Sequence, residues 1–305
     1  MLIKSFSLMK TSSLFISLRV RLIAIILFTL CSLGKAQSVG KDLETGLTSR
    51  GTGLSCDLVY LSDGVDEIKR NTFIYGETYY VNFDGMDGFV REDRRAFPDM
   101  QLLIVSDQGD TALLMRDMYA DYEEGIDFDP MDLYAEVTVA NPIHSGTNYT
   151  LHVHIGDKKG VGTFRTSLDF SVVRDERIVL ESSDLSCREV YLFSLEDGHT
   201  ITDGSCGFNE TVYFLFEGLE GFSVSSGQVQ LGLSMLVRDA EGNIILDEAD
   251  LFGDARQNYE DVHQQIASSL ILTGTQIANP VHYEVRIWDK QGQAWINAAT
   301  ELVVE

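Results

Sequence analysis

The chain has 305 residues, with 47 acidic against 23 basic side chains and a formal net charge of −24. Such a charge excludes nucleic acid and anionic membrane surfaces as expected partners, because their phosphates would be repelled. It is compatible with cation binding, with cationic ligands or simply with solubility. Hydrophobic residues make up 44% of the chain, too many for an intrinsically disordered protein.

The first 36 residues have the layout of a secretory signal peptide. They contain five basic residues and no acidic one, and an apolar run over residues 22–33 follows the early bases. That run is shorter than the roughly 20 residues that span a bilayer. Gly34 and Ala36 place small residues before a cut at Gln37. The sequence thus predicts a chain exported to the periplasm or the exterior, with no membrane span after cleavage; an uncleaved anchor and lipidation at Cys31 are the alternatives.

A tandem duplication underlies the rest of the chain. Phe83-Asp-Gly-Met-Asp-Gly-Phe89 returns 133 residues later as Phe216-Glu-Gly-Leu-Glu-Gly-Phe222, with four identities and three conservative exchanges. Leu54-Ser-Cys56 returns as Leu185-Ser-Cys187. A repeat of about 130 residues is the size of a domain. The sequence therefore predicts a flexible leader over 37–53, a first repeat over 54–173, a linker over 174–184 and a second repeat over 185–305.

Both repeats have the pattern of short strands. Alternating apolar residues predict strands over 77–83, 134–140, 149–155 and 164–172, and a half-buried strand in which Cys56, Leu58 and Tyr60 face inward. Residues 100–105 and 111–115 flank a hairpin signal. Asp129-Pro130 suggests a single helical turn. The repeats diverge over 254–272, where apolar residues spaced by three and four predict a short helix.

One segment of the first repeat carries a resemblance to known domains. Asn141-Pro-Ile-His-Ser-Gly-Thr-Asn-Tyr-Thr-Leu-His-Val153, followed by Asp157-Lys-Lys-Gly160 and a last strand, is similar to the end of immunoglobulin-like and fibronectin type III-like domains. The resemblance implies an all-β protein of two tandem antiparallel β-sandwich domains, with Tyr149 at a corner and Leu151 in the core. In the second repeat Tyr283 aligns with Leu151, so the corner is not repeated. Such sandwiches occur in exported bacterial envelope proteins and imply no chemistry.

The three cysteines beyond the predicted cut suggest one disulfide. Cys56 and Cys187 are repeat equivalents, whereas Cys206 aligns with Phe73. Only the second repeat therefore holds two cysteines, and an oxidising compartment favours a bond between Cys187 and Cys206 with Cys56 a free thiol. No cysteine or histidine spacing suggests zinc.

The duplicated acidic loop is a candidate calcium site. Asp84 and Asp87 in the first repeat correspond to Glu217 and Glu220 in the second. A tight turn brings such carboxylates together, and Ca²⁺ prefers oxygen ligands, although it takes six to eight of them. The other interpretation is structural, because the glycines suit a turn and the phenylalanines on either side suit a core.

Two histidines form a second candidate metal site. His152 and His154 lie two apart on one strand face, and His144 is close in sequence. Two imidazoles at this spacing can share a metal only when a third ligand completes the site. The second repeat has Glu284 and Arg286 at the matching positions, which favours an ordinary solvated face.

The two tryptophans form a candidate binding face. Trp288 and Trp295 flank the turn Asp289–Gly292, and pairing of its ends places Arg286 opposite Trp295. The three side chains would share one outward face that can stack on a sugar or anchor a protein partner. A structural cross-strand clasp between the arginine and the rings is the alternative.

No nucleophile elbow, phosphate loop, dinucleotide fingerprint or HExxH motif occurs after the predicted cut. The sequence therefore predicts a secreted, non-enzymatic, two-domain protein that serves in adhesion, assembly or scaffolding at the cell surface or envelope. The alternative is a carbohydrate- or calcium-dependent binding module, and the third hypothesis is a hydrolase that uses paired acids.

Overall fold

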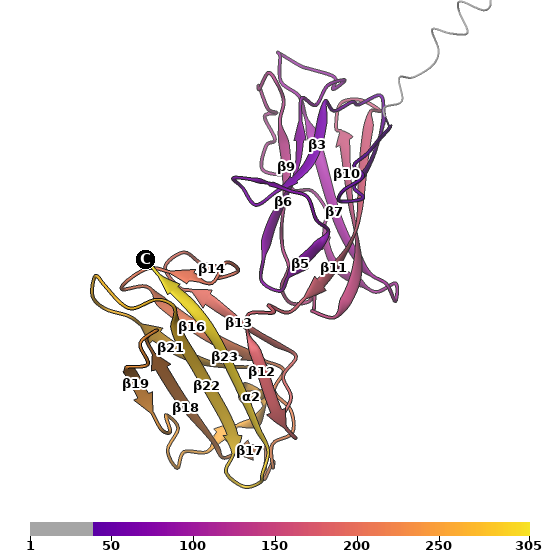
Figure 1. Cartoon of the computed structure of the whole chain (residues 1–305). Helices are drawn as coiled ribbons and strands as arrows, with labels where there is room; N and C mark the ends of the chain where they lie inside the picture. Colours follow the sequence, from indigo (N-terminus) through magenta and orange to yellow (C-terminus); the bar gives the residue numbers. More distant parts are fainter. Residues whose placement is uncertain (1–38) are drawn as a thin grey trace, which may run out of the picture.

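The computed structural model describes residues 39–305, so the predicted signal peptide lies outside the described residues. Their strands form two bodies that follow one another along the chain (Figure 1), and the one helix described is short. Each body has its own cluster of buried apolar side chains, spanning Leu47 to Val172 in the first and Ile178 to Val304 in the second. The fold is all-β, in two sandwich domains.

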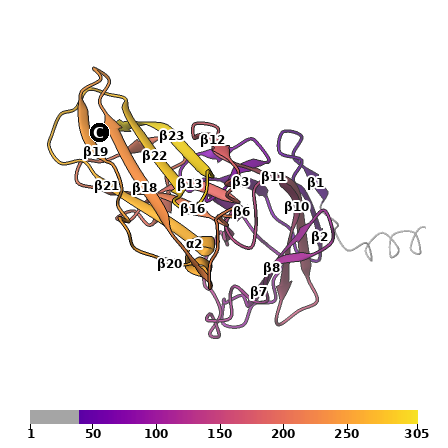
Figure 2. The ribbon, with the colours of Figure 1, turned by 90° about the horizontal axis from the view of Figure 1, so that it is seen from below.

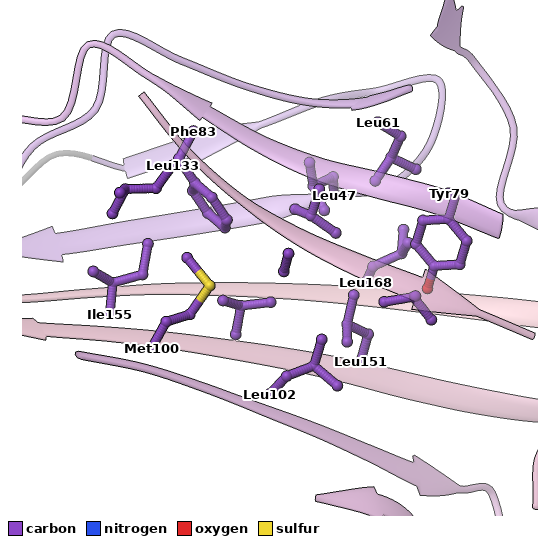
Figure 3. Close-up of a cluster of buried hydrophobic side chains, with 14 of the residues drawn as sticks. Leu47, Leu61, Tyr79, Phe83, Met100, Leu102, Leu133, Leu151, Ile155 and Leu168 are labelled. Atoms are coloured by element: carbon purple, nitrogen blue, oxygen red, sulfur yellow. The ribbon is translucent and has the colours of Figure 1, made fainter. Parts of the chain in front are cut away.

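The first domain is built from eleven strands. They are β1 (Val39–Lys41), β2 (Thr48–Thr52), β3 (Leu58–Ser62), β4 (Glu67–Ile68), β5 (Thr72–Ile74), β6 (Thr78–Asp84), β7 (Pro98–Ser106), β8 (Thr111–Met115), β9 (Leu133–Thr138), β10 (Thr147–Asp157) and β11 (Thr163–Val173). One sheet has the order β1-β2-β11-β10-β7-β8 with β5 against β11, and the other has the order β4-β3-β6-β9. Figure 3 shows the core between them, where Met100, Leu102 and Leu151 of one sheet face Leu61 and Phe83 of the other.

The second domain repeats this plan. Its elements are β12 (Val179–Ser183), β13 (Glu189–Ser194), β14 (His199–Thr200), β15 (Ser205–Cys206), β16 (Thr211–Glu217), β17 (Gln228–Val229), β18 (Leu231–Arg238), β19 (Ile244–Glu248), β20 (Gln257–Asn258), α2 (Tyr259–Gln264), β21 (Gln265–Ile271), β22 (Val281–Asp289) and β23 (Trp295–Val304). The larger sheet has the order β12-β23-β22-β18-β19, and the smaller has β14-β13-β16-β21. Even the parallel pairing recurs, since Phe73 lies beside Val172 and Cys206 beside Val304.

The duplicated loop is a turn that anchors each core. Phe83, Phe89, Phe216 and Phe222 are all buried, as the repeat predicts. Gly88 and Gly221 have φ angles of 94° and 105°, and a Cβ there would lie 2.2 Å from Gly53 O and 2.0 Å from Asp184 O. Only glycine allows both the left-handed conformation and this close approach.

The corner at Tyr149 matches the immunoglobulin-like resemblance. Tyr149 is buried, and its hydroxyl oxygen accepts a hydrogen bond from the His144 N–H (2.8 Å). Leu151 lies in the core as expected. Tyr283, at the position of Leu151 in the second domain, is fully buried, and its hydroxyl lies 2.9 Å from the Ser268 hydroxyl. The second domain thus replaces the corner with a buried polar pair.

The predicted disulfide is wrong. Cys56, Cys187 and Cys206 are all free thiols. Cys206 lies in β15 along the larger sheet, whereas Cys187 directly precedes β13 of the smaller one. Burial raises the pKa of both to about 11.

Several boundaries also differ from expectation. The leader predicted over 37–53 contains β1 and β2, and the linker predicted over 174–184 contains β12, because each segment pairs with the last strand of a domain. In β3 the facing is opposite to the prediction, since Leu61 is buried and Leu58 is exposed. Residues 129–130 form no helical turn. The predicted helix is real only over α2, after which β21 takes its place beside β16.

Candidate functional site

The tryptophan face lies on the larger sheet of the second domain; we define it as Arg286, Trp288, Trp295 and Asn297. Buried Val285 and Ile287 alternate with Arg286 and Trp288 along β22, so the latter two point away from the core. Trp295 and Asn297 occupy the same face of β23. Both indoles are partly exposed and Arg286 is exposed. The expected surface cluster is therefore present.

The register of this hairpin differs from the predicted one by two residues. Trp288 lies directly opposite Trp295, and Arg286 lies opposite Asn297. The turn is longer than expected, because Asp289 N–H donates to Ala294 O (2.9 Å) rather than pairing with Gly292. The Arg286 guanidinium still reaches Trp295 diagonally, with Cζ 4.6 Å from the ring centroid. This cation–π contact fixes the arginine beside the ring.

Gly232 on the neighbouring strand sets the position of Trp288. The two residues are cross-strand partners, and a Cβ at Gly232 would lie 2.0 Å from Trp288 Cζ2 and 2.1 Å from Cε2. The indole therefore occupies the space above Gly232 that a side chain at this position of β18 would fill. Trp288 thus packs against the glycine on the neighbouring strand.

Asn297 adds an unsatisfied polar group to this face. Its Oδ1 is buried and has no hydrogen-bond partner among the described residues. A buried acceptor without a donor is costly. Sequence reasoning did not include Gly232 or Asn297. Both residues follow from the strand register, and the spacing of the tryptophans in the sequence does not define that register.

The acidic loop of the second domain serves the junction between domains. Tyr75 and Tyr191 donate hydroxyl hydrogen bonds to Glu217 Oε2 (3.0 Å) and Oε1 (2.6 Å), and Gln265 Nε2 donates to Oε1 (3.3 Å). Burial, followed by the Glu217 carboxylate, raises the pKa of both tyrosines, so the hydroxyls remain donors. Glu220 is exposed on the same loop.

A second acid, Glu189, completes the junction. Glu189 lies opposite Glu217 in the β13–β16 ladder and is fully buried. Its oxygens accept hydrogen bonds from the Ser145 N–H (3.0 Å) and hydroxyl (2.7 Å), and His144 Nδ1 lies 3.6 Å away. Arg174 donates to Cys187 O (2.8 Å) and Arg188 O (2.7 Å). Several directed contacts therefore connect the two domains.

The calcium hypothesis gains no support from the described residues. They contain no group of three or more histidine, cysteine, aspartate or glutamate side chains placed to share a metal ion. Backbone pairing accounts for the loop positions of Asp87 and Glu220, opposite Ser55 and Ser186. His152 and His154 do share the outward face of β10, as predicted.

A cleft of about 940 Å³ opens beside the junction, and residues of both domains line it. Its acids include Asp63 and Asp203. Backbone hydrogen bonds from Asp66 and Val65 lower the pKa of Asp63. Burial raises the pKa of Asp203, but hydrogen bonds from Ser205 outweigh it and the net shift is downward. A carboxylic acid catalyst needs the opposite shift, so neither group is tuned to donate a proton near neutral pH.

No protein-family model and no curated protein matches this chain. Among solved structures, pT26-6p is 8% identical over 88% of this chain and 66% of that one, with a TM-score of 0.26. Fibronectin(III)-like modules of Clostridium thermocellum CbhA are 11% identical over 81% and 94%, with a TM-score of 0.20. A protein assigned as a beta-galactosidase from Bacteroides fragilis is 10% identical over 83% and 41%, with a TM-score of 0.21.

Because all three TM-scores lie below 0.5, these likenesses carry no argument about function. Across residues 39–305, no helix combines the length and apolar character that a membrane span requires. The features that distinguish the chain are its two β-sandwich domains, the hydrogen-bonded junction between them and the tryptophan face on the second domain.

Proposed function

We propose that this protein is a secreted, non-enzymatic adhesion or scaffold module of the cell envelope, and that the tryptophan face binds a glycan there. The observation that carries the proposal is the indole of Trp288 packed on Gly232, beside Arg286 and the unsatisfied Asn297 Oδ1. A flat ring stacks on the apolar face of a sugar, while the arginine and the amide bond its hydroxyl groups.

Comparison with the first domain supports a role of the tryptophan face beyond folding. Gly156 and Thr163 occupy the places of Trp288 and Trp295 in the first domain, and they form the same cross-strand pair. The sandwich therefore folds around this hairpin without any aromatic ring. Two partly exposed tryptophans on a soluble domain are consistent with a surface kept for binding.

The test is a double variant, Trp288→Ala with Trp295→Ala, measured against the unchanged protein on a glycan array and on cell-envelope material. We expect the variant to keep its thermal midpoint and to lose retention, because the rings contribute contact surface and not core. Phe128→Ala is the matched control, since Phe128 is an exposed aromatic residue of the first domain.

If the double variant is less stable but its remaining folded fraction is still retained, the two tryptophans form a structural clasp and the binding role is refuted. Binding to a purified envelope protein in place of every glycan would replace the sugar by a protein partner on the same face.

A further inference from the structure

A row of basic side chains crosses the larger sheet of the first domain. Arg50 of β2 lies opposite Arg165 of β11, and Arg165 lies opposite His154 of β10. Two residues further along the strands, Lys41 of β1 and His152 of β10 belong to the next set of cross-strand partners on the same face. Figure 2 shows these four strands next to one another on one side of the first domain. We call these five residues the basic row.

The basic row lines an open groove of about 840 Å³. No aspartate or glutamate is among the described residues that line it. Within residues 39–305, Lys41 and Arg165 have no ion pair with an acid, and His154 Nε2 is buried without a hydrogen-bond partner. The nearest acids along the strands, Asp99 and Asp169, pair with Gly156 and Thr150 in other rows.

The second domain shows that the fold does not require this arrangement. Its equivalent row contains Glu181, Asn297 and Arg286 on β12, β23 and β22. Charges of opposite sign balance there, whereas two arginines face each other in the first domain. Like charges directly opposite on neighbouring strands destabilise a sheet. The first domain has this pair of arginines although acidic residues outnumber basic ones in the chain, whose net charge is −24.

We propose that the basic row binds an anionic group, a carboxylate or a sulfate ester, of an acidic glycan. The planar guanidinium of Arg165 matches such a group with two parallel hydrogen bonds, and Lys41 adds a point charge. Thr48, Ser167 and the amide of Gln101 share the outward face and provide partners for sugar hydroxyls. A bound anion also offers an acceptor to His154 once the flexible arginines beside it turn toward the ligand.

The overall negative charge does not prevent such binding. At physiological ionic strength charges are screened beyond about 8 Å, so an anion in the groove meets mainly the local bases. The open shape favours a chain that runs across the sheet. This site does not rest on the tryptophan face, which lies on the other domain.

The experiment is affinity electrophoresis of the purified full chain through gels that contain polygalacturonate, dextran sulfate or neutral dextran. The variants are Arg165→Ala and Arg165→Glu, and the control is Arg256→Ala, which removes an exposed base from the second domain. Thermal melts confirm that each variant is folded. Sedimentation velocity at low salt measures self-association in parallel.

We expect either polyanion, but not dextran, to retard the protein, and retardation to weaken with salt. Arg165→Ala should lower the affinity about tenfold or more, since it removes charge-assisted hydrogen bonds. Arg165→Glu should abolish retardation, and Arg256→Ala should leave it unchanged. Equal retardation of the wild type and Arg165→Glu overturns the proposal, as does no retardation of the wild type. Self-association that Arg165→Glu removes, without glycan retention, also overturns it and assigns the groove to the acidic surface of a second copy.

Discussion

At the scale of single residues, two equivalent aspartates show which parts of the sequence repeat are structural. Asp157 accepts a hydrogen bond from the Val90 N–H (2.8 Å), and Asp289 accepts one from the Ser223 N–H (2.9 Å). Both carboxylates are buried and connect the last hairpin of a domain to the segment after its duplicated turn. The aspartates that begin the turns Asp157-Lys-Lys-Gly160 and Asp289-Lys-Gln-Gly292 therefore have the same structural role.

Truncation of a phenylalanine in the duplicated turn should destabilise its domain strongly. Phe83→Ala or Phe216→Ala removes a fully buried ring and leaves a cavity, so we expect a loss of about 3–5 kcal/mol in the free energy of unfolding. Denaturant melts measure it, with the exposed Phe128→Ala as control. A loss below about 1 kcal/mol at both positions contradicts the anchoring role.

The buried thiols should make stability fall in alkaline solution. Burial raises the pKa of Cys56 from 9.0 to about 12 and that of Cys187 to about 11. Above about pH 9 the unfolded chain loses thiol protons that the folded chain keeps, so the unfolded state binds fewer protons and the free energy of unfolding decreases as pH rises. Below that pH the thiols are protonated in both states and contribute no slope.

Denaturant melts under reducing conditions between about pH 8 and pH 11 check this behaviour. Cys56→Ala should decline less steeply than the wild type. A free energy of unfolding that stays constant over the whole range contradicts the raised pKa of these thiols.

At the scale of elements, periodicity located most strands but not their partners. Alternation of apolar residues placed β6, β10 and β11 because each has one face in a core. It missed β1 and β2, whose exposed residues carry no such signal and which are ordered by pairing with each other and with β11. Register depends on turn length, so the tryptophans were assigned to the right face but to the wrong partners.

The disulfide prediction failed for a related reason. Equivalence of Cys206 with Phe73 was correct, since both occupy parallel pairings at the same place. Residue equivalence does not show where each cysteine lies, however: Cys206 is in β15 beside the larger sheet, whereas Cys187 lies in the segment before β13 of the smaller one.

The support beneath Trp288 gives a test that keeps both tryptophans. Gly232→Ala introduces a methyl group where the indole now lies, so the ring must tilt away from β18. We expect glycan retention to fall several-fold while the thermal midpoint changes little, because the ring is partly exposed. Ser234→Ala, two residues along the same strand face, is the control. Unchanged retention in Gly232→Ala shows that the position of Trp288 over Gly232 is not required.

At the scale of the whole molecule, the junction determines how the tryptophan face and the basic row are presented together. Glu217 receives hydrogen bonds from Tyr75 of one domain and Tyr191 of the other. These contacts should restrict the relative orientation of the two domains more than a short linker alone, because the tyrosine hydroxyls lose their acceptor when the domains move apart. From the sequence, Glu217 was a candidate calcium ligand, with a structural turn as the other interpretation, and its contact with Tyr75 was not predicted.

Glu217→Ala should therefore loosen the two domains. The variant leaves two tyrosine hydroxyls without their acceptor, and each unsatisfied donor costs about 1–3 kcal/mol. We expect small-angle scattering to show a larger radius of gyration and melting to separate into two steps. Glu220→Ala on the same loop is exposed and should behave as the wild type. Scattering curves that coincide for Glu217→Ala and the wild type contradict this role.

The central claim is that the tryptophan face binds envelope glycan, and the chain itself contains the probe for it. Trp288 and Trp295 are its only two tryptophans, so all tryptophan emission comes from this face. The most direct measurement is a fluorescence titration of the intact protein with the glycan that retains it. We expect a saturable blue shift whose midpoint matches the retention affinity, because the ligand covers the partly exposed rings. Retention with unchanged tryptophan emission would contradict it.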